Sequence, residues 1–186
     1  MEFIPTAIED VILIKPRIFE DERGFFTETY RVEQFEKAGI RETFVQDNLS
    51  RSVRNTLRGL HYQMERPQAK LVMVTSGEIL DVAVDLREDS PSFGKYVSYR
   101  LSGDNKHMLY IPTGFAHGFF VLSEEATFLY KCSDYYHPSG ERGVCWDDPE
   151  IGIEWPYGEP VLSGKDKKLP FLSNLKPEDM PGSKKG

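Results

Sequence analysis

Residues 79–87 read Ile-Leu-Asp-Val-Ala-Val-Asp-Leu-Arg, and this alternation decides the fold class. Large apolar side chains recur at every second position, at Leu80, Val82, Val84 and Leu86. Side chains two residues apart lie on the same face of a β-strand, so one face is apolar while the other carries Asp81, Ala83 and Asp85. The pattern predicts a half-buried strand.

The same period of two recurs in short runs that are separated by glycine, proline, aspartate and asparagine. These runs cover residues 43–48, 57–63, 70–76, 96–101, 107–111, 118–122 and 127–132. Many short strands at close spacing are typical of a β-sandwich or barrel, so we expect an all-β fold. One helix is predicted over residues 31–38, ended by Gly39, and a second short helix is expected after Ser163, which can cap it.

Length and composition describe one domain followed by a short tail. The chain has 186 residues, of which 39% are apolar and 28% charged, enough for a single sizeable core. We expect one domain over residues 1–173. Residues 174–186 are polar and rich in proline and glycine, which predicts a surface tail that docks weakly or frays.

Charge and terminal sequence argue against several classes of partner. The net charge of −7 argues against nucleic acid, because phosphate backbones are held by broad basic surfaces. The apolar run at residues 11–14 is far shorter than the roughly 20 residues that span a bilayer, so no membrane partner is expected. Cys132 and Cys145 suit neither a disulfide framework nor a zinc site, which favours free thiols in the cytoplasm.

The first candidate site is the strand-like segment 58–63, which reads RGLHYQ. Alternation places His61 and Gln63 on one face, while Leu60 and Tyr62 lie on the other and can pack into the core. Arg58 precedes the histidine and Lys70 follows a short way on, so a base lies beside fixed positive charge. This arrangement predicts chemistry on a small anionic molecule.

A second candidate segment lies downstream, where a strand over 107–111 leads into the turn and returning strand of residues 112–117, PTGFAH. That connection would place His117 just inside a barrel wall. Together with His61 it resembles the paired signature of the cupin superfamily, small jelly-roll barrels that usually bind a metal. Metal-binding cupins carry a second imidazole in the first motif where this chain has Gln63. Two imidazoles without a firm third ligand make a poor transition-metal site, so we expect a metal-free pocket and no cofactor.

Six motifs then point to one family. They are RGFF at residues 23–26 with Glu28, QDN at 46–48, RGLHYQ at 58–63, PTGFAHGF at 112–119, YKCSDYY at 130–136 and WDDP at 146–149. In this order they closely resemble the dTDP-4-dehydrorhamnose 3,5-epimerases, and the match runs to residues 165–166. The resemblance implies a cupin-type jelly roll with a few short flanking helices. It also implies an isomerase that inverts C3 and C5 of dTDP-4-dehydro-6-deoxy-D-glucose, giving dTDP-4-dehydro-L-rhamnose for dTDP-L-rhamnose synthesis.

The chemistry that the resemblance implies needs a base, an acid and an oxyanion partner. A neutral imidazole can accept a proton at neutral pH, so His61 is the expected base. By resemblance Asp166 lies beside it, although its Gly-Lys-Asp-Lys turn would by itself indicate a surface position. Lys70 would face the oxyanion at C4, and Tyr130 would be the proton donor on the opposite face of the sugar.

The substrate-binding residues also follow from the resemblance. Arg23 and Arg58 suit the diphosphate, since planar guanidinium groups match its oxygens. The other expected contacts to sugar, phosphate or base are Phe26, Glu28, Gln46, Asn48, His117, Tyr136, Glu141 and Lys165. The family further implies a homodimer that exchanges N-terminal strands, with residues 23–28 as the donated piece.

Three alternatives remain open on the sequence. A close relative would invert only C3 or only C5, or would accept another nucleotide-linked 4-keto-6-deoxy sugar. A cupin metalloenzyme, such as a dioxygenase, would contain bound iron or another metal. A sugar-nucleotide binding module would bind without turnover.

Overall fold

Antiparallel strands pair into two large sheets and one separate hairpin in the computed structural model, which describes residues 1–156 and 158–182. The six-stranded sheet has the order β1 (Glu2–Pro5), β2 (Ile12–Lys15), β10 (Met108–Ile111), β7 (Lys70–Ser76), β12 (Glu125–Cys132) and β5 (Gln46–Val53). The five-stranded sheet has the order β13 (Glu141–Gly143), β6 (Leu57–Gln63), β11 (Phe115–Val121), β8 (Glu78–Asp85) and β9 (Tyr96–Ser102).

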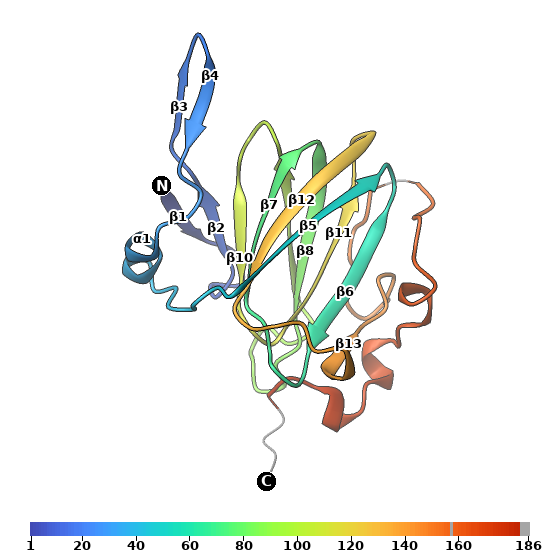
Figure 1. The fold of residues 1–186 in the computed structure, drawn as a ribbon. Helices are drawn as coiled ribbons and strands as arrows, with labels where there is room; N and C mark the ends of the chain where they lie inside the picture. The colour runs from blue at the N-terminus through green and yellow to red at the C-terminus, as the bar shows by residue number, and fades with distance from the viewer. Residues whose placement is uncertain (157, 183–186) are drawn as a thin grey trace.

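The remaining elements are short. The hairpin consists of β3 (Ile18–Asp21) and β4 (Gly24–Thr27), and it stands clear of the two large sheets (Figure 1). Within the described residues, one α-helix, α1 (Val32–Lys37), is accompanied by four 3₁₀ turns at Pro138–Gly140, Asp166–Lys168, Leu172–Asn174 and Pro177–Asp179. No helix of the described residues is long and apolar enough to cross a membrane. The all-β jelly roll of cupin type with short flanking helices is therefore confirmed.

Most strands lie where the period of two predicts them. β6 and β7 have the predicted bounds, while β5 begins three residues later than expected and β11 three residues earlier. The predicted helix is α1, shortened by one residue at each end. The short helix expected after Ser163 is the 3₁₀ turn Asp166–Lys168.

The prediction of a half-buried strand over residues 79–87 is wrong, because β8 is buried on both faces. Asp81, Ala83 and Asp85 are each fully buried. The opposite face of the strand, with Val82 and Val84, packs against the C-terminal segment through residues such as Ile151 and Leu172. The strand therefore has core on both sides, and its aspartates point into protein instead of water.

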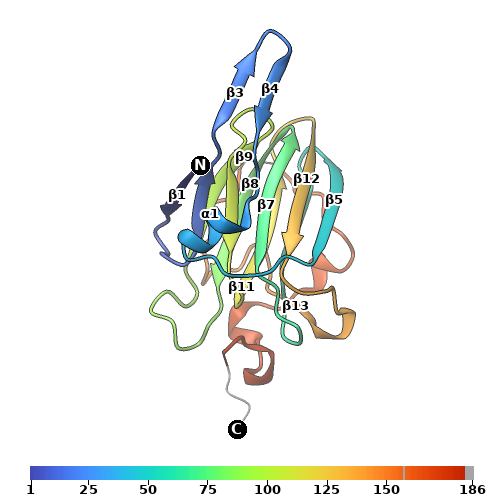
Figure 2. The ribbon, with the colours of Figure 1, turned by 60° about the vertical axis from the view of Figure 1, so that its left-hand side comes forward.

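Apolar clusters hold the layers together. The largest lies between the two sheets, where Val72 and Val74 of β7 meet Phe119 and Val121 of β11. A second covers the outer face of the five-stranded sheet under the C-terminal segment, which wraps that side of the molecule (Figure 1). A third packs Phe35 of α1 on the outer face of the six-stranded sheet (Figure 2). The outer faces are thus covered around α1 and under the C-terminal segment, while Leu49 and Val53 of β5 stay exposed.

The C-terminal tail makes defined contacts within its described part. The Tyr62 hydroxyl donates a hydrogen bond of 2.7 Å to the Asp179 carbonyl oxygen, and Arg142 forms an ion pair with the Asp179 carboxylate. Leu175 packs against the second apolar cluster. These contacts tie the tail to the back of β6, the strand that carries His61.

Candidate active site

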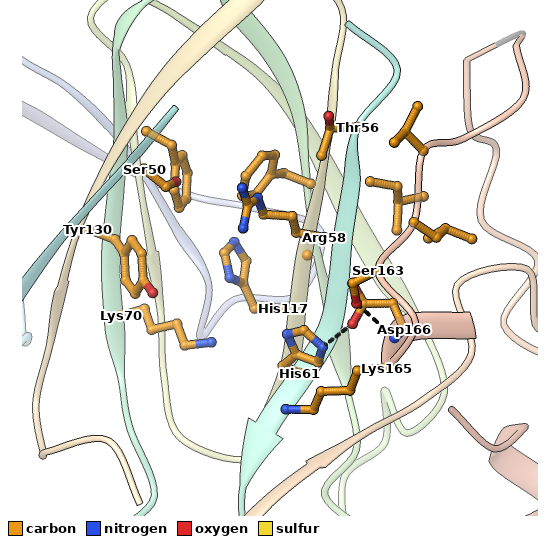
Figure 3. Close-up of a pocket in the computed structure, with 16 residues that line it drawn as sticks. Ser50, Thr56, Arg58, His61, Lys70, His117, Tyr130, Ser163, Lys165 and Asp166 are labelled. Carbon is orange, nitrogen blue, oxygen red and sulfur yellow. Dashed lines mark hydrogen bonds and ion pairs between the residues drawn. The ribbon is translucent and has the colours of Figure 1, made fainter. Parts of the chain in front are cut away.

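A cavity of about 490 Å³ opens between the two sheets and is lined by all four predicted catalytic residues. His61 and His117 come from the five-stranded sheet, and Lys70 and Tyr130 come from the six-stranded sheet. Figure 3 shows Tyr130 and Lys70 on one side of the cavity and His61 with Asp166 on the other. A molecule held between the sheets would have groups from both sheets against its two faces.

His61 points into the cavity because of its position on β6. Its neighbours Leu60 and Tyr62 are buried in the apolar cluster behind the strand, as alternation requires. The His61 Nε2 atom lies 2.7 Å from Asp166 Oδ1, and no hydrogen bond engages the Nδ1 atom of the same ring among the residues that the structure describes. The imidazole is therefore fixed by a carboxylate at one nitrogen, while the other can meet a ligand.

Asp166 is buried, contrary to the surface position that its polar turn would suggest. Its side chain is only 4% exposed, because the 3₁₀ turn Asp166–Lys168 folds against β6. Burial opposes ionisation of this carboxyl, but the hydrogen bond from His61 and the charge of that ring outweigh burial, and the pKa of Asp166 lies below its ordinary value. The pair thus has an ionised carboxylate behind the imidazole.

Lys70 is the first residue of β7 and lines both this cavity and a smaller adjoining one of about 310 Å³. Within the described part of the chain its ammonium group has no ion-pair partner closer than 4 Å. Burial lowers the pKa of Lys70, while the nearby Cys132, Asp81 and Glu141 act in the opposite direction. Such a cation is placed to meet negative charge that arrives with a ligand or develops on it.

Tyr130 lies on β12, across the cavity from the His61–Asp166 pair (Figure 3). Its ring packs on Phe128, with centroids 5.4 Å apart. Burial is the main cause that raises the pKa of the Tyr130 hydroxyl above its ordinary value. The phenol therefore keeps its proton at neutral pH and can give it to a ligand.

His117 forms a second histidine–carboxylate pair, with an aspartate that sequence reasoning missed. Its Nε2 atom lies 2.9 Å from Asp81 Oδ2, and the two side chains are 7% and 0% exposed. β11 pairs with β6 in a register that sets His117 beside His61. Alternation along residues 79–87 predicts that Asp81 lies on the polar face of a half-buried strand. The available signal was an aspartate in mid-strand, whose burial needs a polar partner on a neighbouring strand.

Arg58 lines the same cavity. Its side chain is held by Ser52, a second residue that the sequence did not indicate. The Arg58 Nε atom donates a hydrogen bond of 3.0 Å to the hydroxyl of Ser52, which is buried. With Nε engaged, the two terminal nitrogens of the guanidinium remain for a ligand (Figure 3). A planar pair of donors of this kind suits phosphate oxygens.

Five more of the predicted binding residues meet in the adjoining cavity and its rim. The Tyr136 hydroxyl donates a 2.6 Å hydrogen bond to Glu141, which also forms an ion pair with Lys165. Gln46 accepts a hydrogen bond from the Tyr136 backbone and donates one to Asn48. Burial opposes ionisation of Glu141, but Lys165 and Tyr136 outweigh it and lower the pKa of Glu141. These polar groups are linked in one network beside the larger cavity.

The three N-terminal residues of the predicted site do not join these cavities within one protomer. Arg23 is 85% exposed and pairs with Asp21 on the projecting hairpin. Phe26 is exposed on the same hairpin, and Glu28 binds Arg31 and Gln34 beside α1. In the described chain, none of the three lines either of the two cavities. The hairpin instead extends away from the sandwich (Figure 2).

Gln63, which stands where metal-binding cupins have a second imidazole, is engaged elsewhere. Its amide donates to the Arg66 carbonyl oxygen at 2.7 Å and accepts from the His137 backbone at 2.8 Å. Across residues 1–156 and 158–182, no three histidine, cysteine, aspartate or glutamate side chains converge as metal ligands would. The side chains that meet in the cavity are a base with its carboxylate, an ammonium group, a phenol and a guanidinium.

Comparison with known proteins identifies the family. The family model of dTDP-4-dehydrorhamnose 3,5-epimerase matches residues 5–174. An enzyme of that name from Pseudomonas aeruginosa is 57% identical over 170 residues, which cover 90% of this chain and 94% of the relative. A crystal structure of a dTDP-6-deoxy-D-glucose-3,5-epimerase from Legionella pneumophila, in complex with dTDP-4-keto-L-rhamnose, superposes with a TM-score of 0.95 at 49% identity and covers 97% of each chain.

One relative is named for inversion of a single carbon, which is the alternative reaction. A dTDP-4-dehydrorhamnose 3-epimerase from Streptomyces niveus is 40% identical over 178 residues, covering 95% of this chain and 86% of the relative. The sequence identity to the 3,5-epimerases is higher, at 57% and 49%, over 90% and 97% of this chain. With the cavity, its paired side chains and these similarities in agreement, the chain belongs to the dTDP-4-dehydrorhamnose 3,5-epimerase family of isomerases.

Proposed function

We propose that the chain inverts C3 and C5 of dTDP-4-dehydro-6-deoxy-D-glucose and so produces dTDP-4-dehydro-L-rhamnose for dTDP-L-rhamnose synthesis. One observation carries the proposal. The His61–Asp166 pair faces Lys70 and Tyr130 across one cavity, so a base, a cation and a protonated phenol surround the same space. These are the groups that epimerisation next to a ketone requires.

The reaction begins with removal of a proton from carbon. The hydrogens at C3 and C5 are both adjacent to the C4 carbonyl and are therefore acidic. His61 takes one of them at Nδ1, because Nε2 is bound to Asp166, and the carboxylate stabilises the imidazolium that forms. The electron pair moves into an enolate whose oxygen bears negative charge. Lys70 stabilises that oxygen, and a fixed cation beside such developing charge lowers the barrier by several kcal/mol.

The second half of the reaction returns a proton to the opposite face. Tyr130 lies across the cavity from His61 and retains its proton at neutral pH. Transfer of that proton to the carbon inverts the centre, and proton exchange with solvent resets both groups. The same base and acid serve C3 and C5 in turn once the sugar presents each carbon.

Binding of the nucleotide completes the proposal and involves a second protomer. Arg58 meets the diphosphate from within the cavity, while the network of Gln46, Asn48, Tyr136, Glu141 and Lys165 contacts the rest of the substrate. We propose a homodimer in which the hairpin β3–β4 of one protomer brings Arg23 and Phe26, with Glu28, to the cavity of the other. The exposed phenylalanines of the free-standing hairpin support this role. The free thiols of Cys132 and Cys145 support a cytoplasmic location.

Turnover in deuterated water tests the function. Wild-type protein supplied with dTDP-4-dehydro-6-deoxy-D-glucose should incorporate deuterium at both C3 and C5, and His61→Ala should incorporate it at neither. His137→Ala is a matched control, because His137 also pairs with a carboxylate, Glu65, but lies outside both cavities. It should behave as wild type. Normal exchange by His61→Ala would refute the mechanism.

The same experiment separates the alternatives. Deuterium at one carbon only would identify a single-centre epimerase. Binding without exchange by wild type would identify a binding module. Loss of turnover on dialysis against a chelator, restored by a metal, would identify a metalloenzyme.

A further inference from the structure

The second histidine–carboxylate pair, His117 with Asp81, has no role in the mechanism above. Asp81 is fully buried, and its Oδ1 atom has no hydrogen-bond partner among the residues that the structure describes. Its Oδ2 atom bonds His117 alone. A buried carboxylate with half of its acceptors unpaired costs stability, so stability does not explain its presence. What Asp81 contacts is a histidine on the wall of the reaction cavity.

Two contacts fix the orientation of the His117 ring. Asp81 holds its Nε2 atom at 2.9 Å, and the ring stacks on Phe128 with an interplanar angle of 18°. Within the described part of the chain the Nδ1 atom makes no hydrogen bond, and His117 lines the cavity. The ring therefore offers a ligand one defined nitrogen, as His61 does on the neighbouring strand.

The surroundings of His117 favour the neutral imidazole. Burial lowers its pKa, Asp81 opposes that effect, and the nearby Lys70 and His61 add to it. A neutral imidazole has one N–H and one acceptor nitrogen. With Nε2 facing a carboxylate, the N–H lies there, and Nδ1 is an acceptor.

Because Nδ1 of His117 is an acceptor, it can bind only a group of the substrate that donates a hydrogen bond. Phosphate oxygens offer no hydrogen and would be repelled by a lone pair, whereas hydroxyl groups of the hexose are donors. His117 lies opposite His61 in the strand register, so it contacts the same region as the base, which acts on the sugar ring. We propose that Asp81 is a positioning residue that holds His117 with its proton on Nε2, so that Nδ1 accepts a hydrogen bond from a sugar hydroxyl. The identity of that ligand rests on the proposed function.

Nitrogen-15 NMR of the imidazoles tests the tautomer directly and requires no turnover. The chain has only four histidines, and the spectrum of His117→Gln assigns the signal of His117. In wild type at pH 7 we expect Nε2 protonated and Nδ1 unprotonated. Protonation of Nδ1, alone or together with Nε2, would overturn the proposal even if the enzyme is fully active.

A double-mutant cycle tests the consequence for the substrate. Asp81→Asn keeps the shape but can donate to Nε2, which moves the ring proton to Nδ1, a change of tautomer that is costly in other histidine–aspartate pairs. We expect kcat/KM to fall by about tenfold to a hundredfold, mainly through KM, as for an unpaired buried polar group. In the His117→Gln background the same change should cost almost nothing.

The control is another buried aspartate on the same strand. Asp85 bonds Arg87 and lies outside both cavities, so Asp85→Asn should lower stability but leave kcat/KM unchanged. An equal loss from Asp81→Asn in both backgrounds would mean that Asp81 is only structural, and would refute the proposal. If Asp81→Asn does not fold, the tautomer of His117 in wild type, measured by nitrogen-15 NMR, decides whether the proposal holds. Failure of wild type to turn over would instead refute the proposed function.

Discussion

His61 Nε2 lies 2.7 Å from Asp166 Oδ1, although the two residues are 105 positions apart in the chain. The carboxylate comes from a 3₁₀ turn that follows the last long strand, and it reaches β6 from outside the sandwich. Because the catalytic strand and the turn belong to different layers, the pair forms only when the C-terminal segment is docked. The carboxylate contact that orients the His61 ring therefore depends on tertiary packing.

Replacement of Asp166 by asparagine should disable the base while leaving the cavity in place. The imidazole would lose its anionic partner and could take the wrong tautomer, so we expect kcat to fall by about 10²–10⁴-fold with a smaller change in KM. Steady-state kinetics and circular dichroism together check this. Activity within threefold of wild type would contradict the assigned pairing.

Replacement of Lys70 by methionine should separate activity from stability. Loss of the group that faces the C4 oxygen should lower kcat by about 10²–10³-fold. The half-buried Lys70 ammonium group has no ion-pair partner among the described residues, so its removal should leave the free energy of unfolding unchanged or raise it. Urea denaturation and turnover measure the two effects, and a loss of both would indicate a structural role for Lys70.

Replacement of Tyr130 by phenylalanine should separate exchange from inversion. His61 can still remove and return a proton on its own face, so deuterium should continue to enter the substrate with retained configuration. Inverted product should fall by about 10²–10⁴-fold because the donor on the other face is gone. NMR of the sugar in deuterated water gives both rates, and their equal decline would exclude Tyr130 as the donor.

Mixed dimers test whether the hairpin serves a second protomer. If Arg23 acts in the partner's cavity, a dimer of one Arg23→Ala chain and one His61→Ala chain has one cavity with both changes and one with neither. Co-refolding of the two inactive variants should then restore activity. A mixture of His61→Ala with Lys70→Met is the control, because both residues line the cavity of their own chain, so each cavity of the mixed dimer keeps one change and should stay inactive. Absence of recovery in the first mixture would contradict the exchanged hairpin.

Asp85 should contribute stability that acid removes. Burial opposes its ionisation, but hydrogen bonds from Arg87, Ser90 and Ser92 outweigh burial and lower its pKa from 3.8 to about 2. A carboxyl whose pKa is lower in the folded than in the unfolded state stabilises the fold fully at a pH above its unfolded pKa. This contribution is lost as the pH falls to its folded pKa. Asp85→Asn should lower the free energy of unfolding by about 2 kcal/mol at pH 7, and by progressively less as the pH falls from 4 to 2. A constant difference in unfolding free energy across that range would refute the linkage.

Much of the fold was predictable from local sequence, because alternation and turn residues act over a few positions. β6 and β7 have the predicted bounds, and His61 faces the cavity because Leu60 and Tyr62 require the other side. The period of two could not show whether the polar face of a strand meets water or another layer. That is why the burial of β8, and with it the pairing of Asp81 with His117, was missed.

By itself, then, the sequence determined a set of antiparallel strands, the faces of β6 and, through its motifs, the family. Only the tertiary structure decided what lies behind each histidine and that the hairpin carrying Arg23 is remote from its own cavity. The physical reason is that the side-chain direction along a strand depends on neighbouring residues. The partner of a buried charge depends instead on how distant layers pack.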